Sequence, residues 1–312
     1  MYFLVYYWGS KLYKIRSSFY LFMFTIFGSF LLLIGIYLLL LITGSTNLIL
    51  LENFHFSVNQ QKFFGFLWSV GFGIKVPIFP FHIWLPEVHT EASTSGSVIL
   101  AGIFIKLGIY GLIRFAFTLF PYGIKYLSPV IFIITLFGWV TASIHVLRQY
   151  DWKKIIAYSS ITHMNFAIAS LYTLYIWGLM GCIITSVAHG LSSSGLFICA
   201  GFVYDRTHSR NLFTLQTLFH YYPVFSTFLF IFILANLSFP GTLNFIGELF
   251  SIISLANIDF LLTTLFLWNV LLTTCYSLFL YKRSCFGTFL IRKVKWNKLL
   301  TKPFYLNSQM LV

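Results

Sequence analysis

Two consecutive apolar segments of this chain each carry a lysine well inside them. Lys75 lies within residues 62–86 and Lys106 within residues 97–115, and a short polar loop joins the segments. A helix of about 20 apolar residues crosses the hydrocarbon core of a bilayer. A lysine at the bilayer centre costs roughly 2.5–3.5 kcal/mol on insertion scales. We therefore expect both lysines to line a hydrated protein interior, where their charge can be used.

The composition is that of a membrane protein. Hydrophobic residues make up 59% and charged residues 9% of the sequence, whereas an average soluble domain is about 25% charged. The formal net charge of +13 would suit nucleic acid, but the basic residues lie in short loops between apolar segments, as the positive-inside rule describes. We expect an all-α polytopic membrane protein among lipids, with no nucleic-acid partner. Heavy use of Phe, Tyr, Ile and Leu also favours an A/T-rich organellar gene.

The apolar segments predict eight membrane spans and an N-terminal helix fragment at residues 1–9. The spans are residues 18–43, 62–86, 97–115, 126–147, 155–172, 176–204, 223–258 and 260–281. Breaks are predicted beside Pro77, at Gly190 and at residues 238–241. One transmembrane domain is expected at residues 1–303, followed by a tail at residues 304–312.

The basic residues are unevenly divided between the two ends of these spans. Lys62 and Lys125 are the loop lysines of one end. The other end holds the segments 10–17, 148–154, 205–210 and 282–302, which carry most of the Lys and Arg. The positive-inside rule then places these segments in the cytoplasm or, in an organelle, in the matrix.

Pro77 is expected to interrupt the first lysine helix. Proline lacks a backbone N–H and clashes with an earlier carbonyl, so free backbone groups should lie beside Lys75. The alternative is that Lys75 snorkels to the interface. Lys106 follows a longer run of apolar residues and glycine, which makes snorkelling harder there.

Three more ionisable side chains lie inside predicted spans. His163 and His189 can each accept and donate a proton near neutral pH, although a lone histidine can also be a structural group. Glu248 is the only acid within the predicted spans, and it follows the interruption at residues 238–241, as in helices broken around an ion path. The alternative for Glu248 is a structural ion pair with a lysine.

The remaining chemistry-bearing residues indicate no cofactor in this chain. Cys182, Cys199, Cys275 and Cys285 show no C-x-x-C spacing, so neither a zinc site nor an iron–sulfur site is predicted. A glycine-rich dinucleotide fingerprint is also missing. The cysteines are interpreted as packing or lipid-facing residues.

Four stretches resemble a known membrane-protein family. They are KVPIFPFHIWLPEVHTEASTSGSVILAGIFIKLGIYGLIRF, IIAYSSITHMNFAIAS, VAHGLSSSGLFICAGFVYDRTHSR and GTLNFIGELF. Together they are similar to the proton-translocating antiporter-like subunits of respiratory complex I. Glu248 resembles the subunit 4 branch, because the sister subunits 2 and 5 usually place a lysine there.

The resemblance implies a fold, a proton path and a partner. The implied fold has two inverted repeats with broken helices. The implied path runs through Lys75, Lys106, His163, His189 and Glu248, with Lys75 normally paired to a glutamate on an earlier helix. Residues 1–11 resemble the end of the family's fifth helix, so a separate chain is expected to supply the earlier helices and that glutamate. The family's final helix is expected to be lost or reduced.

The expected function is proton translocation in the mitochondrial inner membrane, as a subunit of H⁺-translocating NADH:ubiquinone reductase. NADH, FMN, iron–sulfur clusters and ubiquinone are then expected in partner subunits, and subunits 2 and 5 of the same family are expected neighbours. Two alternatives stay open. The chain is a subunit of a multi-subunit monovalent cation/proton antiporter, or it is a non-transporting membrane scaffold derived from such a subunit.

Overall fold

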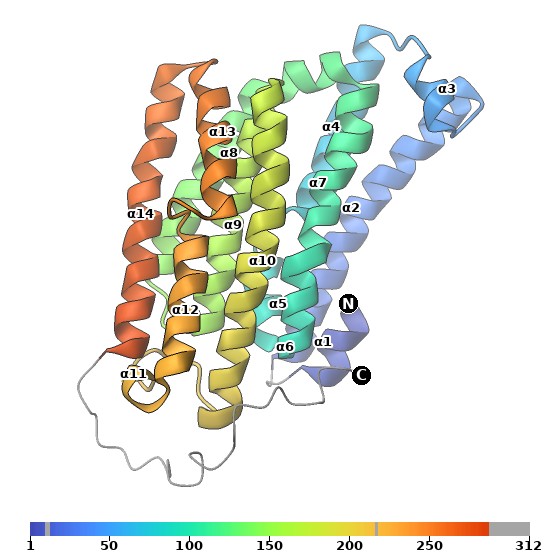
Figure 1. The fold of residues 1–312 in the computed structure, drawn as a ribbon. Coiled ribbons are helices and arrows are strands. Elements are labelled where there is room, and N and C mark those ends of the chain that lie inside the picture. Colours follow the sequence, from blue (N-terminus) through green and yellow to red (C-terminus); the bar gives the residue numbers. More distant parts are fainter. Residues whose placement is uncertain (10–12, 216–217, 287–312) are drawn as a thin grey trace.

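Helices that run between two opposite ends of the molecule build the computed structural model (Figure 1). It describes residues 1–9, 13–215 and 218–286. The helices are α1 (Tyr2–Trp8), α2 (Lys14–Thr43), α3 (Leu48–Glu52), α4 (Val58–Lys75), α5 (Trp84–Glu91), α6 (Thr94–Ile99), the π-helical η1 (Leu100–Phe104), α7 (Ile105–Gly111), the π-helical η2 (Leu112–Phe117), α8 (Pro121–Leu147), α9 (Trp152–Leu171), α10 (Ile176–Thr207), α11 (Leu218–Tyr221), α12 (Pro223–Asn236), α13 (Leu243–Ala256) and α14 (Phe260–Cys285). The predicted all-α fold is confirmed for the described residues.

Five helical stretches within the described residues are long and apolar enough to cross a membrane. They are Lys14–Thr43, Thr94–Phe117, Pro121–Leu147, Ile176–Thr207 and Phe260–Cys285. The shorter apolar helices α12 and α13 follow one another along the height of the molecule in Figure 1. By length and composition the described part supports five of the eight predicted spans. The predicted boundary at residue 303 and the tail at residues 304–312 lie outside the described residues.

Local chemistry determines where α4 begins and ends. Ser57 forms a capping box with Gln60, in which Gln60 N donates to Ser57 Oγ at 3.4 Å and Ser57 N donates to Gln60 Oε1 at 2.9 Å. α4 ends at Lys75, because Pro77 cannot continue the helical hydrogen bonding. The predicted interruption beside Lys75 is therefore confirmed. So is the break at residues 238–241, which separates α12 from α13.

α10 is continuous where a break was predicted. The helix runs without interruption from Ile176 to Thr207, so the predicted break at Gly190 is wrong. The hydroxyls of Ser192 and Ser194 donate to carbonyls of the preceding turn, at 3.3 Å and 2.9 Å. They bond within the helix instead of competing with it. A single glycine costs a helix only about 1 kcal/mol, which packing against neighbouring helices outweighs.

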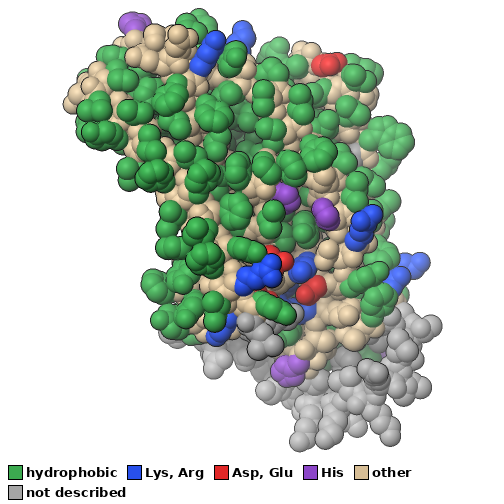
Figure 2. Space-filling view, turned by 180° about the vertical axis from the view of Figure 1, so that it is seen from behind, with side chains coloured by type: hydrophobic (Ala, Val, Ile, Leu, Met, Phe, Trp, Pro, Cys, Tyr) green, Lys and Arg blue, Asp and Glu red, His purple; other side chains and the backbone are tan. Residues whose placement is uncertain are grey.

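α9 is the central helix of the molecule. Lys154 and Tyr158 are its only residues that are not buried, and it packs against α5, α8, α10, α13 and α14. The outer face of α2, by contrast, exposes many large apolar side chains, and apolar side chains dominate the upper part of the face in Figure 2. A buried polar centre with an apolar exterior is the arrangement that a lipid environment favours.

Loops that are distant in sequence meet at one end of the molecule. Trp152 N donates to Arg210 O at 3.0 Å, and Lys153 Nζ donates to Ala92 O at 2.8 Å. The Arg210 guanidinium donates to Thr90 O. The segments around residues 90–92, 148–154 and 205–210 therefore lie together. We call this the basic end.

Replacing Gly247 with alanine should loosen the packing of α13 on α10. A Cβ atom at Gly247 would lie 2.6 Å from Thr185 Cγ2 and 2.7 Å from Thr185 N. Overpacking of this kind costs about 1–3 kcal/mol, so we expect a lower midpoint of thermal unfolding. The midpoint can be followed by dye labelling of the buried cysteine thiols during heating, after the exposed Cys275 has been blocked. Gly102→Ala is the matched control, because a Cβ there meets nothing within 4 Å. Equal midpoints for the two variants would contradict the close packing.

Candidate functional site

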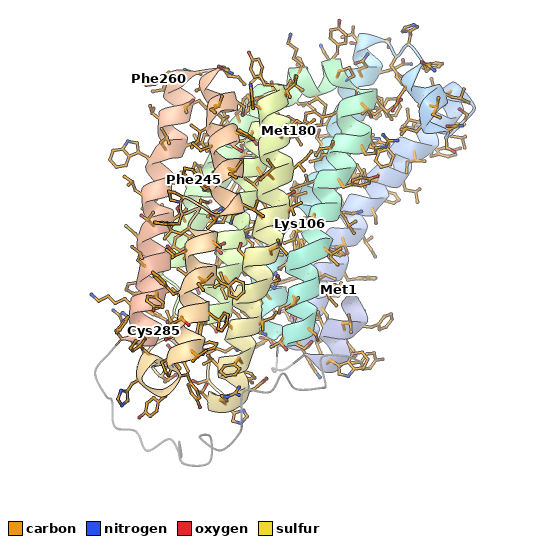
Figure 3. All side chains as sticks on the ribbon, in the orientation of Figure 1. Met1, Lys106, Met180, Phe245, Phe260 and Cys285 are labelled. Carbon is orange, nitrogen blue, oxygen red and sulfur yellow. The ribbon has the colours of Figure 1, made fainter. Side chains whose placement is uncertain are left out.

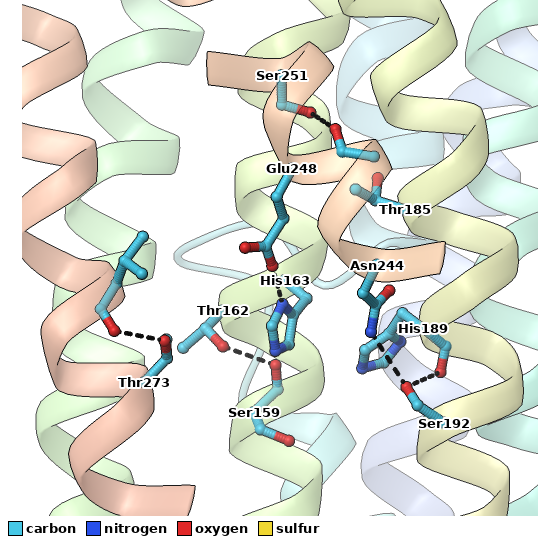
Figure 4. Close-up of polar contacts among 12 residues, drawn as sticks. Ser159, Thr162, His163, Thr185, His189, Ser192, Asn244, Glu248, Ser251 and Thr273 are labelled. Carbon is cyan, nitrogen blue, oxygen red and sulfur yellow. Dashed lines mark hydrogen bonds and ion pairs between the residues drawn. The ribbon is translucent and has the colours of Figure 1, made fainter. Parts of the chain in front are cut away.

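Two histidines from neighbouring helices lie next to each other inside the helix bundle. The rings of His163 on α9 and His189 on α10 have centroids 5.3 Å apart, and the two residues are 6% and 0% exposed. Figure 4 shows them between α9, α10 and α13. The Nε2 atom of each ring has no hydrogen-bond partner among the described residues. Buried nitrogens of this kind are normally satisfied by water, so each ring keeps one nitrogen for a further polar contact.

Lys106 reaches this pair from α7. Its Nζ atom lies 3.3 Å from His189 Nδ1 and donates to Ala101 O at 2.5 Å. Ala101 belongs to η1, directly before α7, and π-helical turns of this kind frequently occur at functional sites. Gly190 makes room for the lysine, since a Cβ there would lie 3.3 Å from Lys106 Cε. Figure 3 shows Lys106 about midway between the two ends of the molecule.

Glu248 lies on the other side of His163. Its Oε1 atom is 3.1 Å from His163 Nδ1, and the side chains of the two residues are 14% and 8% exposed. α13 brings the carboxylate there because it starts anew after the break at residues 238–241 and packs against α10. The structure thus joins four of the five predicted residues in one line of contacts, which we call the central line: Lys106, His189, His163 and Glu248.

Lys75 lies outside the central line. It is the last residue of α4, and its Nζ atom lies 5.7 Å from the centre of the Phe72 ring. Within the part of the chain that the structure describes, no carboxylate lies within ion-pairing distance of this ammonium. α7 passes close by, since a Cβ at Gly108 would lie 3.2 Å from Lys75 Cβ. Lys75 therefore lies beside the helix of Lys106, with no charged partner among the described residues.

Several polar groups around the central line were not predicted from the sequence. Asn244 Nδ2 donates to Ser192 Oγ at 3.4 Å and to Ala235 O at 2.7 Å. Thr162 Oγ1 lies 3.4 Å from Tyr276 OH. Asn244 precedes Glu248 by one helical turn, and this spacing was a usable signal. Tyr276 carries no local signal, because 114 residues separate it from Thr162.

A small cavity with a mainly apolar lining lies next to this network. It has a volume of about 20 Å³, and its polar lining residues are Ser159, Asn236, Tyr276 and Ser277. That volume suits about one water molecule, and Asn236 Oδ1 has no hydrogen-bond partner among the described residues. No group of three His, Cys, Asp or Glu side chains in the described ranges could hold a metal ion. The site therefore offers proton-binding side chains and space for water.

Comparison with known sequences identifies related proteins. The family described as NADH:quinone oxidoreductase/Mrp antiporter, TM, matches residues 1–274. The NADH-ubiquinone oxidoreductase chain 4 of Marchantia polymorpha is 42% identical over 276 residues, covering 88% of this chain and 56% of the relative. The protein of the same name from Acanthamoeba castellanii is 42% identical over 283 residues, covering 91% and 57%. This chain thus spans about half the length of the curated relatives it matches.

Solved structures share the fold. A chain of respiratory complex I from Thermus thermophilus with bound NADH superposes with a TM-score of 0.87 at 24% identity, covering 92% of this chain and 62% of that chain. A chain of the Mrp complex from Dietzia sp. DQ12-45-1b gives a TM-score of 0.81 at 18% identity, covering 89% and 52%. The antiporter-like fold is therefore shared with both complexes.

A double-mutant cycle tests the contact between His163 and Glu248. The single variants His163→Ala and Glu248→Ala and the double variant should show a coupling free energy of about 0.5–3 kcal/mol, as residues in contact do. The measurement is thermal unfolding of the purified protein. Glu52, exposed on α3, is the control, and pairing Glu52→Ala with His163→Ala should give no coupling. Additive effects of the two site variants would contradict the contact.

Proposed function

This chain belongs to the NADH:quinone oxidoreductase/Mrp antiporter family of membrane proteins, and we propose that it carries protons across the mitochondrial inner membrane as subunit 4 of complex I. The observation that carries the proposal is the central line from Lys106 to Glu248. Relatives named chain 4 and the acidic residue at the end of the line support the assignment to that subunit.

Each contact of the central line suits one proton transfer. The Lys106 ammonium gives a proton to His189 Nδ1, and His189 releases one from Nε2. Water carries it to His163 Nε2, and His163 Nδ1 passes a proton to Glu248 Oε1. Histidine suits the middle positions because it both accepts and donates a proton near neutral pH. Only N–H and O–H bonds break and form, so each side chain can return to its original protonation state after a proton has passed.

The energy for uphill transport comes from outside this chain. Moving one unit charge against a potential of 100 mV costs about 2.3 kcal/mol. In our proposal, partner subunits that hold NADH, FMN, iron–sulfur clusters and ubiquinone supply this energy through redox chemistry. This chain contributes the path, and the partners contribute the driving force.

We propose eight membrane spans in total for this chain. Three spans then complete the five long helices: α4 followed by α5, α9 alone, and α12 followed by α13. The basic end, with Lys153 and Arg210, would face the matrix under the positive-inside rule.

A second chain completes the site at Lys75 in this proposal. Lys75 has no carboxylate partner within the described ranges. An unpaired ammonium at membrane depth is costly. We therefore infer that a helix of a partner chain places a carboxylate against Lys75. Subunits 2 and 5 of the same family are further proposed neighbours.

The second candidate function is that of a subunit in an Mrp-type cation/proton antiporter. The similarity of the fold to a chain of the Mrp complex favours it. The proteins that co-purify with this chain discriminate between the two functions. Redox subunits with flavin and iron–sulfur clusters support complex I, and further antiporter subunits alone support the antiporter.

Replacing Lys106 tests the proton path. Lys106→Ala removes the ammonium that contacts His189, so we expect NADH-driven proton translocation to be abolished in vesicles that contain the assembled complex. A pH-sensitive dye measures it. Lys106→Arg keeps the charge but does not release its proton near neutral pH, so it should fail too, whereas a scaffold role predicts rescue. Lys125→Ala, at an exposed lysine, is the control. Full translocation by assembled Lys106→Ala complex would refute the assignment.

Cross-linking tests the proposed partner of Lys75. A carbodiimide joins an amine directly to a carboxylate in contact with it. In the native complex we expect a cross-link between Lys75 and a carboxylate of another chain, and its loss in Lys75→Gln. Mass spectrometry of the digested complex identifies both residues. A structure of the intact complex with no foreign carboxylate beside Lys75 would contradict this inference.

A further inference from the structure

A second row of buried polar atoms leaves the central line along α10, toward the basic end. Residues four apart on a helix share one face, and Ser193 and Phe197 follow His189 at this spacing. Ser193 is 0% exposed, and its Oγ atom has no hydrogen-bond partner among the described residues. The neighbouring hydroxyls of Ser192 and Ser194 both donate to carbonyls of their own helix. The unpaired hydroxyl of Ser193 therefore differs from those of the serines beside it.

His89 on α5 lies farther along the same face of α10. It is 0% exposed, and its ring stacks on that of Phe197 with centroids 4.4 Å apart and planes 10° from parallel. Within the described part of the chain, neither of its ring nitrogens has a hydrogen-bond partner. Leaving a buried polar group unpaired is unfavourable. Such groups in folded proteins normally bond to another protein group or to ordered water.

The charges around His89 connect the centre of the molecule with the basic end. Lys106 of the central line and Lys153 at the start of α9 both act electrostatically on the His89 ring, and His89 acts in turn on His189. Lys153 is 2% exposed and donates to Ala92 O at 2.8 Å. His89 therefore precedes by three residues the Ala92 carbonyl that Lys153 binds, and it lies within electrostatic range of Lys106.

We propose that water molecules join His189 Nε2 to His89 past Ser193 Oγ, and that His89 is a further proton-carrying residue linking the central line to the basic end. The four unpaired atoms, namely His189 Nε2, Ser193 Oγ and both ring nitrogens of His89, are the contacts of this water. One proton leaves one histidine as one binds to the other, and only N–H and O–H bonds change. This branch rests on the proposed proton-carrying function and gives it an opening at the basic end.

A structure of the intact complex that resolves ordered water tests the branch without any measurement of transport. We expect water within hydrogen-bond distance of His189 Nε2, of Ser193 Oγ and of at least one His89 ring nitrogen. A dry, filled space between His189 and His89 would overturn the proposal.

Variants of the assembled complex test the branch by its activity. His89→Gln keeps a polar planar side chain but cannot take up a proton, and Ser193→Val fills the space beside the hydroxyl. We expect each to lower the rate of proton translocation roughly a hundredfold, at the lower end of the effects seen when a positioned proton-transfer group is removed. His145→Gln and Ser194→Ala are the matched controls, since His145 is exposed and the Ser194 hydroxyl bonds its own helix.

The outcomes distinguish the branch from the function on which it rests. If Lys106→Ala translocates protons normally, the proposed function itself fails. If Lys106→Ala fails while His89→Gln and Ser193→Val match their controls, only the branch is wrong. If His89→Gln does not assemble, Ser193→Val and the ordered water decide. A loss in His89→Gln that Ser193→Val does not share, with no water between the two histidines, would make His89 a positioning residue and overturn the branch.

Discussion

An ionisable side chain is stable inside an apolar helix bundle only where it forms a hydrogen bond or an ion pair with another polar group. Lys106 is held by a carbonyl of η1 and by His189, and Glu248 is held by His163. These contacts connect α7, α10, α9 and α13, so the arrangement of the helices and the arrangement of the charges determine each other. Gly190 and Gly247 allow the helices to pack this closely. A side chain at Gly190 would push Lys106 away, and one at Gly247 would push Thr185 away.

Two helical interruptions place irregular backbone near ionisable side chains, about halfway between the two ends of the molecule. α4 stops at Lys75 and α12 stops before the stretch that leads to Glu248. Each interruption follows from a proline that cannot continue the helical hydrogen bonding. The first interruption is buried at Val76 and Ile78, whereas Phe239 and Leu243 beside the second are exposed. Irregular backbone at membrane depth is tolerated where it is buried in protein, as it is after α4.

Much of this architecture could be predicted from the sequence because its signals are local. Pro77 and the stretch at residues 238–241 indicate interrupted helices by their own chemistry, and a charged residue inside an apolar segment indicates a polar interior. The break predicted at Gly190 was wrong, since the same small residue serves to admit Lys106. That role depends on a helix more than 80 positions away, as the separation of 83 between Lys106 and His189 shows. Tyr276 and Asn236 were missed for the same reason.

The basic end has a mechanical consequence. The carbonyls of Thr90 and Ala92, at the end of α5 and just after it, accept hydrogen bonds from Arg210, which follows α10, and from Lys153, at the start of α9. A displacement of α5 therefore pulls on both later helices at once. The short helix α5 is therefore hydrogen-bonded to two later parts of the chain, and any movement of the segment between Lys75 and α5 is coupled to them.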